Sequence, residues 1–207
     1  MTRPGSFVAI DGPNGIGKTT VTALLCERLA AQGWPTLATK EPTATFLGDT
    51  ARYGTDDYGG LTLACLVTAD RYYHLDTEIR PALAEGKLVV CDRYIATSLV
   101  LQRLDGVDVP YIWTLNQYAE RPDLTIILTG DPARARARAG RRGTYSRFHR
   151  GGIAAGKAEA RLYQETAQEL TERGYPVVSY DVRRRSAEQV VAALVPVILD
   201  HIGSRAP

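Results

Sequence analysis

The chain has 207 residues, 44% of them hydrophobic, and its formal net charge at pH 7 is +2. This length and composition favour one globular domain over residues 1–207, and the near-neutral charge excludes a strong general attraction to nucleic acid or to a membrane surface. The cysteines are Cys26, Cys65 and Cys91, and they form no C-x-x-C pair, which is typical of free thiols in a reducing compartment. The sequence also has no apolar run of membrane-spanning length. We therefore expect a cytoplasmic protein.

Short apolar runs alternate along the chain with longer segments whose apolar residues recur at helical spacing. The expected strands are residues 6–11, 35–40, 87–92, 123–130 and 176–181. The expected helices are residues 21–33, about 61–85, 95–104, 109–120, 132–139, about 154–173 and a final helix after the last strand. Strands separated by helices imply a five-stranded parallel sheet with helices on both faces, an α/β/α sandwich whose ligands lie at the carboxyl ends of the strands.

A glycine-rich turn follows the first expected strand. Residues 12–19, GPNGIGKT, match the G-x-x-x-x-G-K-[ST] phosphate-binding loop (P-loop), and an amphipathic helix follows directly. Backbone N–H groups of such a loop converge on a β-phosphate, and the helix N-terminus adds positive potential. Lys18 is expected to reach the β- and γ-phosphates, and the hydroxyl of Thr19 to bind Mg²⁺. The residues expected to bind ATP here are Gly12, Asn14, Gly15, Ile16, Gly17, Lys18, Thr19 and Thr20.

A carboxylate and an arginine stand at the end of the third expected strand. Asp92 is placed to hold Mg²⁺ through water across from the P-loop, and Arg93 suits bidentate recognition of a phosphate monoester. A strand-end salt bridge between this pair and its neighbours is the structural alternative. No N-K-x-D motif, which a GTPase needs to read its base, is present.

With the P-loop, four further stretches resemble the bacterial thymidylate kinases, and the match spans nearly the whole chain. They are TKEPT at 39–43, TADRYYHL at 68–75, CDRYIATSLVLQ at 91–102 and RPDLTIILTGDP at 121–132. The resemblance implies a P-loop kinase with a short arginine-rich lid at about residues 140–156. It also implies transfer of the γ-phosphate of ATP, with Mg²⁺, to dTMP, and a homodimer.

The resemblance assigns roles at the acceptor side residue by residue. Arg52 matches an arginine that binds the acceptor 5′-phosphate, Arg71 one that hydrogen-bonds the pyrimidine base, and Asn14 a position near the sugar 3′-hydroxyl. Arg52 could instead be a solvated helix arginine, and Arg71 a surface helix arginine paired with Asp70 or Glu78. The residues implied at the acceptor site are Asn14, Glu41, Pro42, Arg52, Val67, Arg71, Arg93, Ser98, Leu101 and Gln102.

Several positions depart from the family pattern. Val67 and Leu101 stand where the family has aromatic rings against thymine, and each lost ring contact forfeits roughly 0.5–1.5 kcal/mol beyond area burial. Thr43 replaces a glycine and Ser146 an aspartate. Two alternatives therefore stay open: a kinase of the same fold for another nucleotide, a nucleoside or a specialised metabolite, and a nucleotide-binding regulator without turnover.

The arginine-rich stretch from Arg134 to Arg150 follows the fourth strand. Relatives without an arginine in the P-loop carry catalytic arginines in the lid, which implies that role for Arg142 and Arg147. Arg138 matches an arginine that packs on adenine. A nucleic-acid patch or a solvated arm is the alternative for this stretch. The histidines, His74, His149 and His201, are scattered and are expected to be surface or packing residues.

Overall fold

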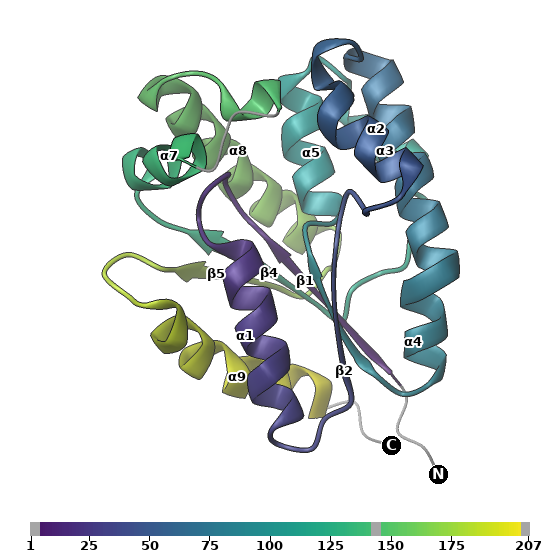
Figure 1. Cartoon of the computed structure of the whole chain (residues 1–207), viewed down its shortest axis with the longest axis vertical. Helices are drawn as coiled ribbons and strands as arrows, with labels where there is room; N and C mark the ends of the chain where they lie inside the picture. The colour runs from purple at the N-terminus through teal and green to yellow at the C-terminus, as the bar shows by residue number, and fades with distance from the viewer. Residues whose placement is uncertain (1–4, 142–145, 204–207) are drawn as a thin grey trace.

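The computed structural model describes residues 5–141 and 146–203. Within them, five parallel strands form one sheet in the order β2-β3-β1-β4-β5 (Figure 1). The strands are β1 (Ser6–Asp11), β2 (Thr36–Lys40), β3 (Leu88–Asp92), β4 (Leu124–Thr129) and β5 (Val177–Asp181). The expected five-stranded parallel sheet is therefore confirmed. Its central strands β3, β1 and β4 are almost wholly buried, as continuous apolar runs predict.

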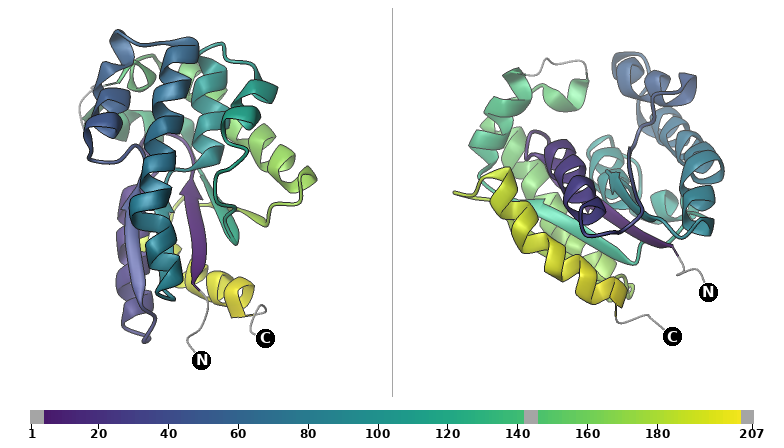
Figure 2. Two further views of the ribbon diagram at one scale, coloured as in Figure 1. Left: turned by 90° about the vertical axis from the view of Figure 1, so that its right-hand side faces the viewer. Right: turned by 60° about the horizontal axis from the view of Figure 1, so that its bottom comes forward.

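Helices cover both faces of this sheet, as Figure 2 shows. They are α1 (Lys18–Ala30), α2 (Phe46–Tyr53), η1 (Gly54–Asp56), α3 (Gly60–His74), η2 (Leu75–Ile79), α4 (Arg80–Ala84), α5 (Ile95–Leu104), α6 (Val109–Leu115), α7 (Pro132–Arg141), η3 (Arg147–His149), α8 (Ile153–Glu172) and α9 (Ala187–Gly203). Across the described residues, no helix is both long and apolar enough to cross a membrane.

The alternation of side chains along β1 explains the two cores. Val8 and Ile10 belong to the cluster that packs α1 and α9 on one face of the sheet. Phe7 and Ala9 point to the other face, into the cluster formed with α4, α5 and α8. The carboxyl ends of β1 and β3 lie side by side, because Ile10 pairs with Asp92 in the parallel register. This register brings the P-loop and the end of β3 to the same edge.

Several elements differ from the sequence expectation. The short helix α2 and the turn η1 were not expected. The helix expected over 109–120 ends at Leu115, where the side chain of Asn116 donates to the carbonyl of Ile112 at 2.8 Å. The long helix expected over about 61–85 is present as α3, η2 and α4, and η2 is a π-helical turn.

Candidate active site

The P-loop connects β1 to α1 and requires glycine at specific points. Gly12, Gly15 and Gly17 have φ values of 141°, 76° and 116°, which side-chain-bearing residues rarely adopt. A Cβ atom on Gly15 would lie 2.1 Å from the carbonyl oxygen of Ala135 in α7. The backbone therefore curls closely under α7, in the form that a phosphate-binding loop needs.

Lys18 begins α1 and is folded back on the loop. Its ammonium group donates hydrogen bonds to the carbonyls of Gly12 at 2.7 Å and Pro13 at 3.0 Å. Burial, followed by the positive charge of Arg93, lowers the pKa of Lys18 from its ordinary 10.5 to about 7. Phosphate groups in this loop would supply the negative charge that the buried ammonium lacks.

Thr19 and Asp92, the two expected metal ligands, are in direct contact. The hydroxyl of Thr19 donates to Oδ2 of Asp92 at 2.5 Å. Oδ1 of Asp92 is buried and accepts no hydrogen bond from the described residues. A hydroxyl oxygen beside such a carboxylate oxygen is the kind of donor set that Mg²⁺ prefers, so these residues fit the ion.

Arg93 directly follows β3 and reaches across to the P-loop. Its backbone φ is 76°, the left-handed region, and its N–H donates to the carbonyl of Ile10 at 2.9 Å. One guanidinium nitrogen donates to Oδ1 of Asn14 at 2.6 Å. The P-loop and Arg93 line one cleft of about 240 Å³. The residues lining it are Asn14, Gly15, Gly17, Lys18, Thr19, Lys40, Glu41, Arg52, Asp92, Arg93, Ala139 and His149.

Some of the P-loop residues expected to bind ATP line the P-loop cleft, and others do not. Those from Asn14 to Thr19 line the P-loop cleft, apart from Ile16. Gly12, Ile16 and Thr20 do not line it; Ile16 is instead packed in the core with 4% of its surface exposed. Arg138, expected against adenine, lies in α7 beside a further cavity lined by Arg134, Arg141 and residues 182–185.

A second cleft adjoins the first and holds every residue expected at the acceptor site. These are Asn14, Glu41, Pro42, Arg52, Val67, Arg71, Arg93, Ser98, Leu101 and Gln102. Oγ of Ser98 and Oε1 of Gln102 are buried and have no hydrogen-bond partner in the part of the chain that the structure describes. Buried polar atoms are normally paired, so these two are suited to a polar ligand in the cleft.

Arg52 lines both clefts, which places it between the donor and acceptor sides. One of its terminal nitrogens donates to the carbonyl of Pro42. Its Nε is buried and makes no hydrogen bond to the described residues. A guanidinium with an unused donor at this junction fits an acceptor phosphate.

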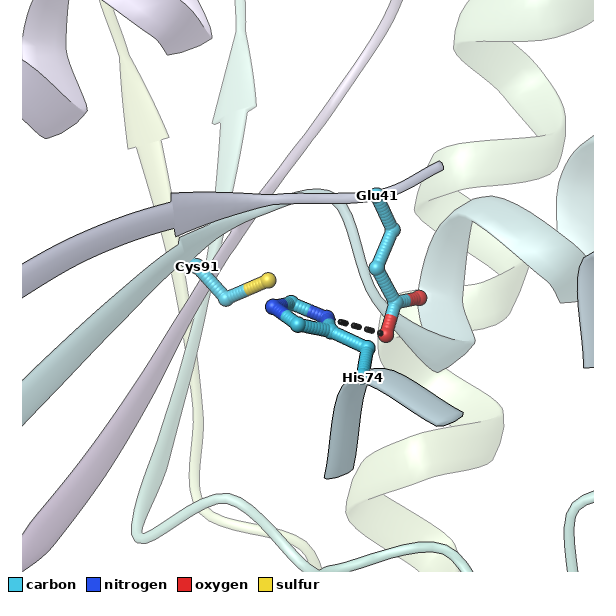
Figure 3. Close-up of side chains that lie close together, drawn as sticks. All are labelled: Glu41, His74 and Cys91. Atoms are coloured by element: carbon cyan, nitrogen blue, oxygen red, sulfur yellow. Dashed lines mark hydrogen bonds and ion pairs between the residues drawn. The ribbon is translucent and has the colours of Figure 1, made fainter. Parts of the chain in front are cut away.

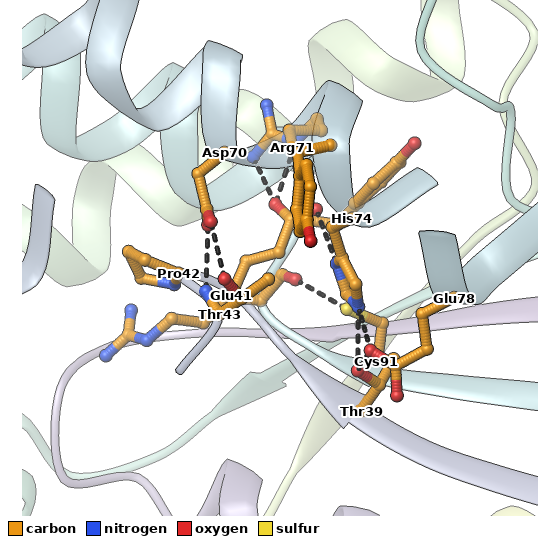
Figure 4. A network of polar contacts seen from close by, with 12 residues as sticks. Thr39, Glu41, Pro42, Thr43, Asp70, Arg71, His74, Glu78 and Cys91 are labelled. Atoms are coloured by element: carbon orange, nitrogen blue, oxygen red, sulfur yellow. Dashed lines mark hydrogen bonds and ion pairs between the residues drawn. The ribbon is translucent and has the colours of Figure 1, made fainter. Parts of the chain in front are cut away.

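Glu41 and Arg71 form a buried ion pair at the wall of the acceptor cleft (Figure 4). Nε and a terminal nitrogen of Arg71 lie 2.8 and 2.6 Å from Oε2 of Glu41, and its other terminal nitrogen donates to Asn116 at 2.5 Å. Arg71 is 1% exposed, so it is a fixed part of the wall rather than a solvated helix residue. Thr43 donates its hydroxyl to Asp70 at 2.5 Å, which holds the loop after β2 on α3.

The imidazole of His74 lies between Glu41 and Cys91 (Figure 3). Its Nδ1 is 3.4 Å from Glu41, and its Nε2 is 2.7 Å from the hydroxyl of Thr39 and 3.0 Å from Glu78. Burial raises the pKa of the Cys91 thiol well above its usual value. Arg71 neutralises Glu41, and both ring nitrogens of His74 are hydrogen-bonded. We therefore interpret Glu41, His74 and Cys91 as a packed cluster that supports the wall of the acceptor cleft.

The arginines of the expected lid are not all directed to the P-loop. Arg142 lies outside the described residues. The guanidinium of Arg147 binds Asp105 and the carbonyls of Thr55 and Tyr58. In this structure an acidic side chain and two carbonyls bind the Arg147 guanidinium, and its expected action on the transferred phosphate stays a prediction.

Two residues at this site carried no sequence signal for their position. Glu159 of α8 is 3% exposed and accepts from the backbone N and from Nδ2 of Asn14 at 3.0 and 2.9 Å. Nε2 of His149 is 3.0 Å from Oδ1 of Asn14. Burial, followed by the charges of Arg93 and Arg136, lowers the pKa of His149 to about 4, so the ring is neutral at pH 7. His149, expected to be a surface or packing residue, lines both clefts.

A P-loop, a strand-end Asp–Arg pair beside it and an adjoining acceptor cleft together define a P-loop kinase. A model of the family described as thymidylate kinase matches residues 10–191. The chain belongs to the thymidylate kinase family.

Individual relatives agree with this assignment. A probable thymidylate kinase of Pyrococcus abyssi is 39% identical over 152 residues, which cover 70% of this chain and 74% of the relative. A thymidylate kinase of Pseudomonas putida is 33% identical over 205 residues, 95% of this chain and 97% of the relative. The crystal structure of thymidylate kinase from Ehrlichia chaffeensis has the same fold, with a TM-score of 0.73, 22% identity, and coverage of 94% of this chain and 99% of that one.

Proposed function

We propose that this protein transfers the γ-phosphoryl group of MgATP to the 5′-phosphate of dTMP, giving dTDP and ADP. The observation that carries the proposal is that the P-loop cleft and the acceptor cleft meet. Their shared lining residues are Asn14, Glu41, Arg52, Arg93 and His149. A nucleotide bound in each cleft would thus present its phosphates to the same group of side chains.

The roles follow from charge and position. Lys18 and the loop N–H groups would bind the β- and γ-phosphates, and Thr19 and Asp92 would hold the Mg²⁺ that neutralises them. Arg52 and Arg93 align the acceptor phosphate. One of its oxygens forms the new bond to the γ-phosphorus, and the bond from that phosphorus to the leaving oxygen of ADP breaks. The acceptor oxygen is already anionic at neutral pH, so alignment and charge neutralisation suffice without a general base.

The base is bound at the other end of the acceptor cleft. Ser98 and Gln102 lie one turn apart on α5 and offer their unpartnered oxygens there. Val67 and Leu101 offer aliphatic contact with the ring.

We also propose a cytoplasmic homodimer whose partners are small nucleotides, not nucleic acid or membranes. Sedimentation of the purified protein tests the dimer.

The test is ADP release by the purified protein with ATP and Mg²⁺ against dTMP, dUMP, dCMP, AMP, GMP and thymidine. The proposal expects dTMP to have the highest kcat/KM. Lys18→Ala should lose turnover and keep the circular dichroism spectrum of the wild type. Activity confined to a nucleoside or a purine would reject dTMP as the acceptor. ATP binding without ADP release on any acceptor would indicate a regulator.

A further inference from the structure

An aromatic ring from the segment after α7 lies in the acceptor cleft. Phe148 of η3 lines this cleft, and so do Val67 of α3 and Leu101 and Gln102 of α5. Phe148 is half-buried. The ring therefore lies in the same cavity as the residues expected around the acceptor base, although it comes from a segment expected to serve the phosphates.

Arg147 holds this ring in place from the neighbouring position. Its backbone N–H donates to the hydroxyl of Thr55 at 3.1 Å, and its guanidinium donates to the carbonyls of Thr55 at 2.5 Å and Tyr58 at 3.0 Å. The guanidinium carbon lies 5.1 Å from the centroid of the Phe148 ring, within cation–π range. These contacts attach η3 to η1 and to the segment between η1 and α3.

Asp105 completes this attachment at the end of α5. Its Oδ2 accepts from the guanidinium of Arg147 and from the backbone N–H of Gly60 at 2.5 Å. One carboxylate thus joins α5, α3 and η3, the three elements that carry Gln102, Val67 and Phe148. The position of the ring in the cleft is fixed by a specific ion pair rather than by loose packing.

The side chains that line the acceptor cleft suit an aromatic ring beside a bound base. Val67 and Leu101 supply aliphatic contact, and Ser98 and Gln102 supply polar atoms for the edge of a base. A planar base gains most from an aromatic neighbour, which contributes beyond the burial of its area. Phe148 is the aromatic side chain of η3 and lies in this cavity together with Tyr94, but the ring of Tyr94 is 1% exposed and packs on Phe7 and Arg71.

We propose that Phe148 is a specificity-determining residue that contacts the base of the acceptor nucleotide. Arg147 is then a positioning residue that holds this ring, not a group that acts on the transferred phosphoryl. The inference rests on the proposed function, because the acceptor is taken to carry a base. It deepens that function by assigning base recognition to the segment that the sequence pattern assigns to catalysis.

The first test removes the ring. Phe148→Leu should raise the KM for dTMP and its calorimetric Kd about tenfold, with the KM for ATP and the kcat at saturating dTMP near wild type. With 2-deoxyribose 5-phosphate, which lacks a base, the variant and the wild type should have equal kcat/KM. Phe148→Tyr should keep the wild-type KM. Phe46→Leu is the control, because Phe46 lies on α2 with 86% exposure.

The second test separates positioning from catalysis at Arg147. Arg147→Met should raise the KM for dTMP as Phe148→Leu does and lower kcat by less than about threefold, and the double variant should resemble either single one. A phosphoryl-stabilising arginine would instead cost on the order of 10³-fold or more in kcat. Val67→Phe added to Phe148→Leu should restore the KM for dTMP, because it returns a ring to the cleft.

These outcomes distinguish the inference from the proposed function. A wild-type KM and Kd for dTMP in Phe148→Leu would overturn the role of the ring, and so would an equal loss with 2-deoxyribose 5-phosphate. A wild-type protein that binds dTMP without phosphorylating it would reject the proposed function, while the Kd comparison would still decide the role of Phe148. A wild-type protein that accepts only a molecule without a base would overturn both.

Discussion

The side-chain oxygen of Asn14 lies 2.6 Å from a guanidinium nitrogen of Arg93, so a hydrogen bond joins the P-loop to the end of β3. The other end of the same amide, and the backbone N–H of Asn14, donate to Glu159 of α8. Asn14 is 2% exposed. Two elements distant in the sequence therefore fix the loop residue that lies between the donor and acceptor clefts.

Removal of the Glu159 carboxylate, which accepts two hydrogen bonds from Asn14, should destabilise the position of Asn14. Glu159→Ala leaves two buried donors of Asn14 unpaired, which should lower the free energy of unfolding by about 1–3 kcal/mol and reduce kcat/KM for dTMP. Glu159→Gln keeps an accepting oxygen and should lose less. Urea unfolding and initial rates measure both. The matched control is Glu172→Ala at the exposed end of α8; equal costs for the two alanine variants would show that the contact with Asn14 contributes little.

Nucleotide binding should be coupled to proton uptake at Lys18. The pKa of Lys18 is about 7 in the free protein, so most of the protein holds a neutral amine at pH 8.5. Bound phosphates favour the ammonium form and raise that pKa, so a proton is taken up at pH 8.5, and ATP affinity falls as the pH rises above about 7. At pH 6 the lysine is already protonated.

Calorimetry in two buffers with different ionisation enthalpies measures this uptake. The uptake attributable to Lys18 is the difference between the wild type and Lys18→Met, which cancels the titration of ATP itself. The difference should approach one proton at pH 8.5 and vanish at pH 6. No difference at either pH would mean that Lys18 is already charged in the free protein.

Asp92→Asn tests the proposed magnesium site. The amide oxygen still accepts from Thr19, but the negative charge beside the buried Oδ1 is lost. The Mg²⁺ concentration for half-maximal activity should rise at least about tenfold, with a smaller change in the KM for dTMP. Asp200→Asn, on an exposed position of α9, should have the wild-type magnesium dependence. If the two variants respond to Mg²⁺ alike, Asp92 has a structural role.

Gln102→Leu should separate a ligand-binding role from a structural one. Oε1 of Gln102 is buried without a partner among the described residues, so its replacement by an apolar side chain of similar size should not lower the free energy of unfolding. The KM for dTMP should nevertheless rise about tenfold. Gln168→Leu on the exposed face of α8 is the control and should keep the wild-type KM. A destabilised variant with unchanged KM would assign Gln102 to the core.

The strands and most helices followed from local pattern, because the central strands are buried on both faces and form continuous apolar runs, while the helices bury one face at helical spacing. Val8 and Ile10 pack on one core, Phe7 and Ala9 on the other. Helix α2 could not be predicted in this way, because its largest apolar residue, Phe46, is 86% exposed. Its fit depends on Gly48, where a Cβ would lie 2.3 Å from the carbonyl oxygen of Thr43.

The candidate site was predictable where a motif fixes both a residue and its direction. The P-loop lysine and the strand-end pair are of this kind, since strand register brings Ile10 beside Asp92. The direction of Arg147 depends on Asp105, which is 42 positions away in the sequence. Glu159 reaches Asn14 across 145 positions. Spacing identifies the residue in such cases, but only the folded chain selects its partner.

The left-handed backbone of Arg93 has a consequence for protein engineering. With φ at 76°, any side-chain-bearing residue at this position carries a conformational cost, of order 1 kcal/mol, that glycine avoids. Arg93→Gly should therefore melt at a higher temperature than Arg93→Ala, although both lack the guanidinium. The guanidinium that reaches Asn14 is therefore held on a backbone conformation that favours glycine.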